Sequence, residues 1–488
     1  MEISNTIQKD FDYIIVGAGP SGLAFAHCCS KIGKKVLIIE RENDIGGCHR
    51  VRRVNGLFTE HGPRIYSSTY KTMIMLLNDM SLNFEDVFTK YNFKLGEISG
   101  KTVFNTLKLS ELFLFGVEFI KLMFNNKHGK DKSVSKFMID NKFTKESIDI
   151  VDRVCRLTDG TSSDHYTLNQ FLQLVNQQIM YTIYQPKYPN DTGLFKIWKT
   201  YLLNTGNVQF LLNTEVQKLE SNENNITSKL YLINTQSNRT LVLNTENSQV
   251  ILAVPPKNMT TMLFNSGVID HDLEKWAIDT AYLDYITIDF HWDTKLDLPK
   301  VYGFTKTDWG IAFIVLSDYM DFENPKSRTV ISVGITRKDY ISKRINKKVD
   351  ECSQKELIEE TFYQLKESFP ELINSTHSII SPGNINITIN GKSKWSCIDT
   401  AFIATADQPY LKPKLGPNLY TLGTHNGNHH YKFTSMESAI TNGIVLANKL
   451  ENDTQKYYKP KRAVTIRDIF VFIILIAALF ILFSKLKK

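Results

Sequence analysis

The sequence has little cysteine, and its cysteines follow no spacing that builds a site. Only six occur in 488 residues, and none form a C-x-x-C pair. This argues against a disulfide framework and fits a reducing compartment. Cys28 and Cys29 lie in a predicted helix, where we expect them to be small core residues.

Excess charge is also scarce outside the C-terminal tail. The net charge is +7, and residues 451–488 hold eight Lys/Arg against three Asp/Glu, so the remaining body is near neutral. Nucleic-acid binding is therefore not expected, because it would require a basic face on the folded domain. Met1–Asp10 is polar, and no signal peptide is expected before the first predicted strand.

The stretch Asp12–Gly47 contains a single nucleotide-binding pattern. Tyr13–Val16 is a short apolar strand, a helix follows over Pro20–Ile32, and a second strand is predicted over Lys35–Glu40. Between the first strand and the helix lies G-x-G-x-x-G, whose glycines permit the turn, the approach of a pyrophosphate and close helix packing. The helix N-terminus then points its N–H groups at the phosphates.

This stretch predicts the residues that contact a dinucleotide. Glu40 ends the second strand, where a ribose needs a carboxylate acceptor. The Gly46-Gly47 pair would let the backbone lie across the phosphates, which favours FAD over NAD. The predicted contacts are Gly17, Gly19, Pro20, Ser21, Gly22, Glu40, Arg41, Gly46 and Gly47.

The pattern GAGPSGL…VLIIERENDIGG resembles the flavin-containing amine oxidase superfamily, which includes monoamine oxidases, protoporphyrinogen oxidases and phytoene desaturases. UDP-galactopyranose mutases share this opening, and Glu60–Tyr66 is similar to their segment. The superfamily usually has Arg directly after the glycine pair. Here Cys48, His49 and Arg50 follow, so either Arg50 supplies that charge or the contact is lost.

The resemblance implies further cofactor contacts along the chain. Val216 would contact the adenine through its backbone, and Gly423, Met436 and Ala439 match the closing strand, loop and helix. That helix N-terminus would lie beside the flavin and stabilise its anionic reduced form. Thr434 and Glu437 predict a capping box at its start.

Two residues are catalytic candidates. Arg64 lies in the segment that crosses near the flavin ring in the resembled families, although a surface arginine is an equally good interpretation. His425 could relay protons or form a pocket wall, as could His429 or His430. No carboxylate or cysteine is spaced with these histidines, so no metal site is expected.

The predicted fold is α/β, with a Rossmann-like FAD-binding domain, an interleaved α+β substrate domain and a C-terminal transmembrane helix. The active site is expected in the cleft between the domains. The FAD-binding domain is expected to consist of three segments, residues 10–69, 205–264 and 395–450. The substrate domain is expected to consist of 70–204, which is mainly helical, and 265–394, which forms a sheet plus a helix. Residues 451–466 are expected to form a linker and 467–485 the transmembrane anchor.

Two apolar stretches suggest membrane contact. Ile469–Phe483 has 15 uncharged residues, or roughly 22 Å of helix against about 30 Å of hydrocarbon, and flanking Arg and Lys side chains extend its reach. It predicts a single-pass anchor, with the body on the cytoplasmic side because more basic residues precede it. Leu109–Phe124 is apolar nearly all round and is predicted to be a buried helix, with a membrane-facing helix as the alternative.

The predicted function is that of an FAD-dependent oxidoreductase that oxidises a C–N or C–C bond of an apolar substrate, with oxygen or another acceptor. The sequence has only one dinucleotide-binding motif, which is assigned to FAD, so no second motif is visible that could bind NADPH. Amine oxidases of the superfamily commonly hold a lysine on the strand that corresponds to Asp284–Trp292, which has none, so amine oxidation is in doubt. Cys397 is the only candidate for covalent flavin, and noncovalent FAD is favoured. A sugar-nucleotide mutase and a non-catalytic flavin-binding scaffold are the alternatives.

Overall fold

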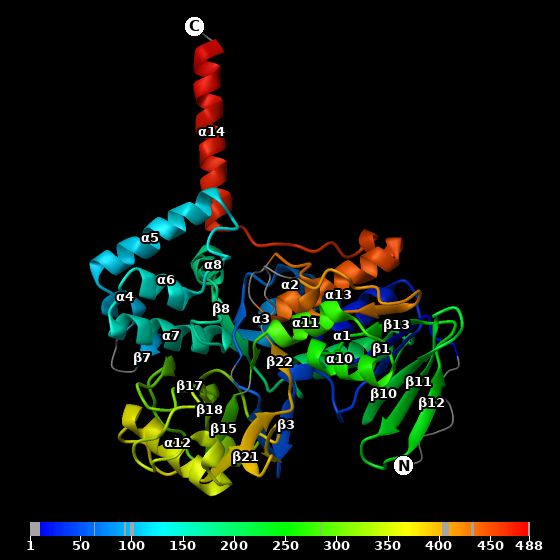
Figure 1. Cartoon of the computed structure of the whole chain (residues 1–488), viewed down its shortest axis with the longest axis horizontal. Coiled ribbons are helices and arrows are strands. Elements are labelled where there is room, and N and C mark those ends of the chain that lie inside the picture. Colours follow the sequence, from blue (N-terminus) through cyan, green and yellow to red (C-terminus); the bar gives the residue numbers. More distant parts are fainter. Residues whose placement is uncertain are drawn as a thin grey trace.

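Two large sheets, of five and six strands, and the helices that cover them form most of the described chain, and one long helix projects from it (Figure 1). The computed structural model describes residues 10–486, except 63, 92–93, 98–101, 284, 403–408 and 431–433. It places the nucleotide-binding pattern in the first sheet and a helical layer against the second.

The first sheet is parallel and contains the predicted opening strands. Its order is β23-β13-β1-β2-β9, with bounds β23 Leu419–Thr421, β13 Gln249–Leu252, β1 Tyr13–Val16, β2 Val36–Ile39 and β9 Val208–Leu211. Tyr13 pairs with both Gln249 and Val36, so strands from distant parts of the sequence meet at β1. The carboxyl ends of the strands share one edge, where parallel sheets bind ligands.

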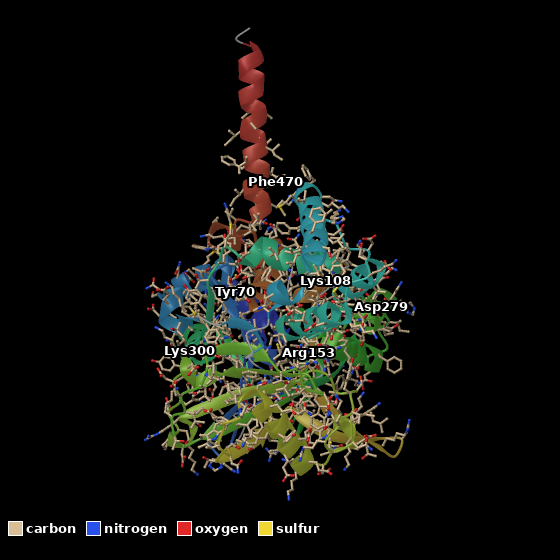
Figure 2. The ribbon with its side chains drawn as sticks, turned by 90° about the vertical axis from the view of Figure 1, so that its left-hand side faces the viewer. Tyr70, Lys108, Arg153, Asp279, Lys300 and Phe470 are labelled. Atoms are coloured by element: carbon tan, nitrogen blue, oxygen red, sulfur yellow. The ribbon has the colours of Figure 1, made fainter. Side chains whose placement is uncertain are left out.

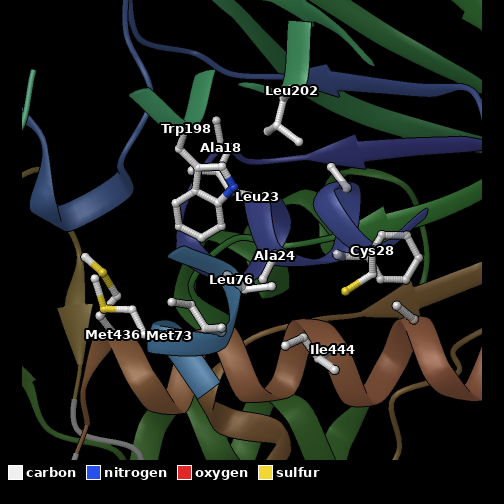
Figure 3. Close-up of a cluster of buried hydrophobic side chains, with 14 of the residues drawn as sticks. Ala18, Leu23, Ala24, Cys28, Met73, Leu76, Trp198, Leu202, Met436 and Ile444 are labelled. Carbon is white, nitrogen blue, oxygen red and sulfur yellow. The ribbon is translucent and has the colours of Figure 1, made fainter. Parts of the chain in front are cut away.

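Side chains of β1 alternate between the two faces of this sheet. Tyr13 and Ile15 join a core with α1 (Pro20–Lys31), α2 (Lys71–Asp79), α9 (Leu194–Asn204) and α13 (Met436–Leu450). Ile14 and Val16 join the core beneath β10 (Thr214–Ser221), β11 (Thr227–Asn234), β12 (Thr240–Asn244), α10 (Pro256–Asn265) and α11 (His271–Asp279). Figure 3 shows Leu23 and Cys28 of α1 in the first core. Cys28 and Cys29 are fully buried, as predicted.

The second sheet is mixed and separates two further cores. Its order is β19-β15-β18-β17-β16-β7, with bounds β19 His377–Ile380, β15 Ile286–Trp292, β18 Thr329–Ile335, β17 Ile311–Val315, β16 Val301–Phe304 and β7 Lys94–Glu97. On β15, Ile288 and Phe290 face the core with α12 (Gln354–Ser368). The opposite face meets α4 (Val103–Thr106), α5 (Leu109–Phe124), α6 (Val134–Asp140), α7 (Lys145–Asp159) and α8 (Leu168–Gln178).

Short elements link the sheets. They are the hairpin β3 (Val51–Val54) and β4 (Leu57–Glu60), the ribbon β5 (Tyr66–Ser67), β8 (Ile183–Pro186) and β6 (Phe88–Lys90), α3 (Phe84–Val87), the pair β14 (Tyr282–Leu283) and β22 (Ala401–Phe402), and the hairpin β20 (Asn384–Ile389) and β21 (Lys392–Cys397). An Asn-Gly pair is the strongest sequence signal for a two-residue hairpin turn, and Asn55-Gly56 joins β3 and β4 as that signal predicts. Both its residues have positive φ, 52° and 78°, as a tight two-residue hairpin requires.

Helix α5 has the predicted bounds, but the prediction that it is buried is wrong. Leu109, Phe113, Ile120 and Phe124 are 57–86% exposed, and they recur at helical spacing along one face. Its two glutamates are buried instead. Glu111 accepts hydrogen bonds from Thr144 N–H and Ser147, and Glu118 pairs with His128 and Lys121. The glutamates therefore turn inwards because they find polar partners there, which leaves the apolar face outside.

Helix α14 (Ile466–Leu486) projects from the end of α5 (Figures 1 and 2). At its base, Phe470 makes an edge contact with Phe124, and Arg467 donates to the Met123 carbonyl at 3.0 Å. Within the described residues, no helix combines the length and apolar character needed to cross a bilayer. The predicted spanning anchor over 467–485 is therefore not supported; the terminal Lys487 and Lys488 lie outside the described residues.

Candidate active site

A cavity of about 1230 Å³ runs between the two sheets. This volume exceeds the roughly 300–1000 Å³ of an ordinary small-ligand pocket. One end is formed by the turns that follow β1 and β2, and the other by α4, α7 and α8. The cavity therefore has room for a dinucleotide and a second molecule.

The glycines of the opening pattern meet different constraints. A Cβ on Gly17 would lie 2.5 Å from the Ala253 carbonyl oxygen, and one on Gly22 would lie 2.5 Å from that of Gly17. A Cβ on Gly19 would meet only the Cα of Gly47, at 3.9 Å. Packing thus explains Gly17 and Gly22, whereas Gly19 faces the cavity and keeps space open there. These are the distinct roles that a dinucleotide cradle requires.

The Gly46-Gly47 pair returns across this cradle as predicted. The Gly46 N–H donates to the Ala18 carbonyl at 2.9 Å, and a Cβ on Gly47 would lie 3.1 Å from the Cα of Gly19. Gly46 and Gly47 have positive φ, 117° and 58°, a conformation that favours glycine. Pro20 and Ser21, at the start of α1, line the same end of the cavity.

Glu40 lines the cavity and is held by its neighbours. It accepts hydrogen bonds from the N–H groups of Ala18 at 2.8 Å and Glu42 at 3.1 Å. The Arg50 guanidinium lies 3.1 Å from Oε1, the same carboxylate oxygen that accepts from Glu42. The predicted ribose acceptor is therefore fixed in place before any ligand binds.

Arg50 reaches the cavity, but its charge faces protein carboxylates. Besides Glu40, its guanidinium approaches Asp399 at 3.8 Å and donates to the Asp44 carbonyl at 3.0 Å. Arg41 also lines the cavity and donates to the Ile398 carbonyl. The sequence left open whether Arg50 supplies the charge beside the phosphates or that contact is lost. The described contacts place Arg50 in an ion-pair network with protein carboxylates, so its charge is not reserved for a phosphate.

The later predicted cofactor residues converge on the same cavity. Val216, Gly423, Met436 and Ala439 all line it. The predicted capping box is wrong, however. Ser435 caps α13 by accepting from the Ser438 N–H, while Glu437 accepts from the N–H groups at the start of α2. Burial raises the pKa of Glu437 to about 7 despite those hydrogen bonds.

The two catalytic candidates lie in different places. Arg64 lines the cavity, and its guanidinium donates to the carbonyls of Cys48 and His61. His425 does not line it. Its ring is buried beside Trp276, Phe402 and Tyr410, with centroid distances of 5.8–6.2 Å. Burial lowers the pKa of His425 to about 3, so its ring is neutral at physiological pH.

His429 is buried and His430 is exposed. Across the described part of the chain, no three His, Cys, Asp or Glu side chains gather closely enough to hold a metal ion.

Sequence reasoning missed a pair of buried carboxyl groups beside the cavity wall. The Glu60 N–H lies 3.4 Å from the Asp289 carboxylate, and burial raises the pKa of each carboxyl group to about 8. The negative charge of Asp289 raises the pKa of Glu60 further. The alternation of β15 was the available signal, because Thr287, Asp289 and His291 interrupt its apolar residues at every second position.

The far end of the cavity is largely apolar. Its walls include Val103, Phe104, Val154, Leu157, Phe171, Leu174, Val175, Ile179, Tyr282 and Leu283. Phe104 is 73% exposed and Ile179 is 64% exposed, so this end reaches the surface between α4 and α8. Such walls suit an apolar molecule that enters from this side.

Comparisons with known proteins agree with this geometry. Residues 15–80 match the family described as an NAD(P)-binding Rossmann-like domain. UDP-galactopyranose mutase from Mycoplasma pneumoniae is 41% identical over 59 residues, which are 12% of this chain and 15% of that protein. All-trans-retinol 13,14-reductase from Danio rerio is 30% identical over 81 residues, 16% of this chain and 13% of that protein. The chain thus matches less than one sixth of the length of these curated relatives.

Solved structures resemble the whole fold. Putrescine oxidase bound to putrescine has a TM-score of 0.61 at 14% identity, covering 90% of this chain and 98% of that one. Cyclohexylamine oxidase from Brevibacterium oxydans has a TM-score of 0.59 at 14% identity, covering 91% and 100%. A protein described as a putative protoporphyrinogen oxidase from Exiguobacterium has 0.57 at 12% identity, covering 90% and 98%. The predicted resemblance to the amine oxidase superfamily is confirmed at the level of the fold.

Proposed function

We propose that this chain is an FAD-dependent oxidoreductase that oxidises a C–N or C–C bond of a largely apolar substrate. The observation that carries the proposal is one continuous cavity with a dinucleotide cradle at one end and apolar walls at the other. When bound, the flavin would accept a hydride from the substrate and pass the electrons to oxygen or another acceptor. Noncovalent FAD is the proposed cofactor.

The residues of the chain have separate tasks in this proposal. Gly19 and the N-terminus of α1 receive the pyrophosphate, and Glu40 binds a ribose hydroxyl. The N-terminus of α13, at Met436, directs its partial positive charge into the cavity, where it favours a reduced, anionic ring. The walls contributed by α4 and α8 exclude water from the reacting bond and orient an apolar substrate.

The cofactor assignment is tested by purification and acid precipitation. The protein should be yellow, and precipitation should release FAD into the supernatant, because no covalent bond to Cys397 is expected. Flavin that remains with the precipitate would contradict noncovalent binding. A preparation that cannot be loaded with FAD would contradict the cofactor itself.

The reaction is tested by anaerobic mixing with amines, porphyrinogens, polyenes and sugar nucleotides while the flavin spectrum is followed. Bleaching by a member of the first three classes is the expected result. A polyene belongs in the screen because a retinol reductase shares the N-terminal segment. The alternative, a sugar-nucleotide mutase, is favoured by the Mycoplasma similarity over 59 residues. It predicts instead that isomerised sugar nucleotide forms only with pre-reduced flavin.

We also propose that the exposed face of α5 and the side of α14 contact a lipid bilayer surface. The α5 face presents Leu109, Phe113, Ile120 and Phe124 to solvent, and Lys108 and Lys121 flank it. Apolar residues with flanking lysines are typical of helices that lie at an anionic membrane surface. The exposed Phe104 continues this surface to the cavity, so an apolar substrate could pass from lipid to the site.

Tryptophan substitutions test this surface in the full chain. Vesicles whose lipids carry bromine on their upper acyl chains should quench the added fluorescence of Phe113→Trp. They should leave that of Phe264→Trp unchanged, because Phe264 is equally exposed, at 72%, but lies on α10. Equal quenching at both positions, or none at position 113, would contradict the α5 contact.

A further inference from the structure

Cys397 and His61 form a close pair on the wall of the cavity. The Sγ atom of Cys397, at the end of β21, lies 2.9 Å from Nδ1 of His61, which follows β4. Both residues line the cavity, and Cys397 is only half-buried. A thiol within hydrogen-bonding distance of an imidazole is the arrangement that activates a cysteine nucleophile.

A fixed carboxylate lies close to the pair. Asp399 follows Cys397 by two residues and is clamped by the Arg52 guanidinium at 2.9 and 2.6 Å, with Arg50 at 3.8 Å. Burial alone would raise the pKa of Asp399, but the hydrogen bonds and charge of Arg52, together with His61, hold it below its usual value. An ionised carboxylate near His61 favours the imidazolium form that a base acquires when it takes a proton.

On the other side, Arg64 donates to the His61 carbonyl at 3.4 Å. The backbone that carries His61 is therefore tied to the cavity wall, and Tyr285 packs against its ring at a centroid distance of 6.3 Å. A base that keeps its position needs little reorganisation when the thiol ionises.

The remaining cysteines lack this environment. Cys28, Cys29, Cys155 and Cys352 are buried away from the cavity, and burial raises the pKa values of Cys28 and Cys29 well above their usual range. Cys48 also lines the cavity and is half-buried like Cys397. It is the comparison cysteine, because its exposure is similar and its thiol makes no described hydrogen bond to a histidine, while the charge of Arg64 acts on it instead.

We propose that Cys397 and His61 are a nucleophile–base pair that captures an apolar α,β-unsaturated carbonyl compound in the cavity. His61 Nδ1 takes the thiol proton, and the thiolate forms an S–C bond at the β-carbon. The C=C electron pair shifts to give an enolate, which regains the proton from His61 at its α-carbon. The product is a thioether, and no further reactant is consumed. This addition requires no electron transfer, so it stands whether or not the proposed oxidoreductase function is correct.

Selective alkylation tests the pair in the full chain as purified. Iodoacetamide is added at pH 7, and the extent of reaction at each cysteine is followed by peptide mass spectrometry. Because an ordinary thiol is only a few per cent ionised at this pH, Cys397 should react about tenfold faster than Cys48. At pH 10 hydroxide can take the place of His61 as the base, so the two rates should converge. Equal rates at pH 7 would overturn the proposal.

Two further measurements separate activation from simple access. In His61→Gln, the alkylation rate of Cys397 at pH 7 should fall to that of Cys48. The alkylation rate of Cys48 should stay unchanged, and this result also shows that the cavity remains folded. 2-Cyclohexenone should then add its own mass at Cys397 in the wild type and not in Cys397→Ser. Failure of this adduct to form, or an unchanged rate in His61→Gln, would refute the nucleophile–base pair. A flavin found covalently on Cys397 would refute it as well.

Discussion

Substitution of Gly19 should separate flavin binding from folding. Its φ of −76° and ψ of 171° suit any residue, and a Cβ there meets no protein atom closer than 3.9 Å. Gly19→Ala should therefore stabilise the flavin-free protein by about 0.4–1 kcal/mol, because the unfolded chain loses freedom. The same methyl group enters the space left for the pyrophosphate. Overpacking of that kind costs about 1–3 kcal/mol, or about a five- to 150-fold loss of FAD affinity.

The assay combines urea unfolding of the flavin-free protein with titration of FAD fluorescence. Gly19→Val, with its larger side chain, should bind no detectable flavin. Gly116→Ala is the control, because a Cβ there would meet no atom of another element within 4 Å and Gly116, in the middle of α5, does not line the cavity. It should raise stability by about 0.5–1 kcal/mol, as alanine in place of glycine within a helix does, and leave the FAD affinity unchanged. Normal FAD affinity in Gly19→Ala would refute the assignment of the cradle.

Carboxyl groups whose pKa values shift in opposite directions give opposite pH dependences. Hydrogen bonds, of which the one from His27 contributes most, hold the pKa of Asp79 well below its usual value. Ionised Asp79 therefore stabilises the folded state above about pH 4, and this stabilisation is lost as the pH falls further. Asp79→Asn should therefore cost about 2–4 kcal/mol in urea unfolding at pH 7, and the difference from wild type should shrink below pH 4; a constant difference would contradict this. Burial raises the pKa values of Asp289 and Glu60 to about 8, so the wild type should lose stability as the pH rises from about 4 to about 8. Asp289→Asn should show a smaller loss between urea titrations at pH 5.5 and pH 8, and an unchanged slope would contradict the coupling.

Local rules predicted the part of the fold that depends on short segments. Tyr13–Val16 and the Asn55-Gly56 turn lie where the sequence placed them, because a buried strand and a two-residue turn each follow from adjacent residues. The glycine pattern likewise identified the cradle, since backbone geometry there depends on the presence or absence of a Cβ.

Errors arose where a side chain chooses between distant partners. Glu437 was expected to cap its own helix, yet it caps α2, which is brought near only by the tertiary fold. Helix α5 was expected to be buried, but its glutamates find buried polar partners, which leaves its apolar face exposed. The Cys397–His61 pair joins residues 336 positions apart, which no local pattern indicates.

The parallel sheet has a consequence for how the protein is made. β1 must pair with β13, and β13 with β23, so the sheet cannot be completed until residue 421 has left the ribosome. Tyr13 and Ile15 also need α13, from 436 onwards, to cover their face. Pairing over such separations is slow and leaves apolar strands uncovered during synthesis. Nascent chains that stop short of α13 should therefore depend on chaperones, and only release of nearly the whole chain permits folding.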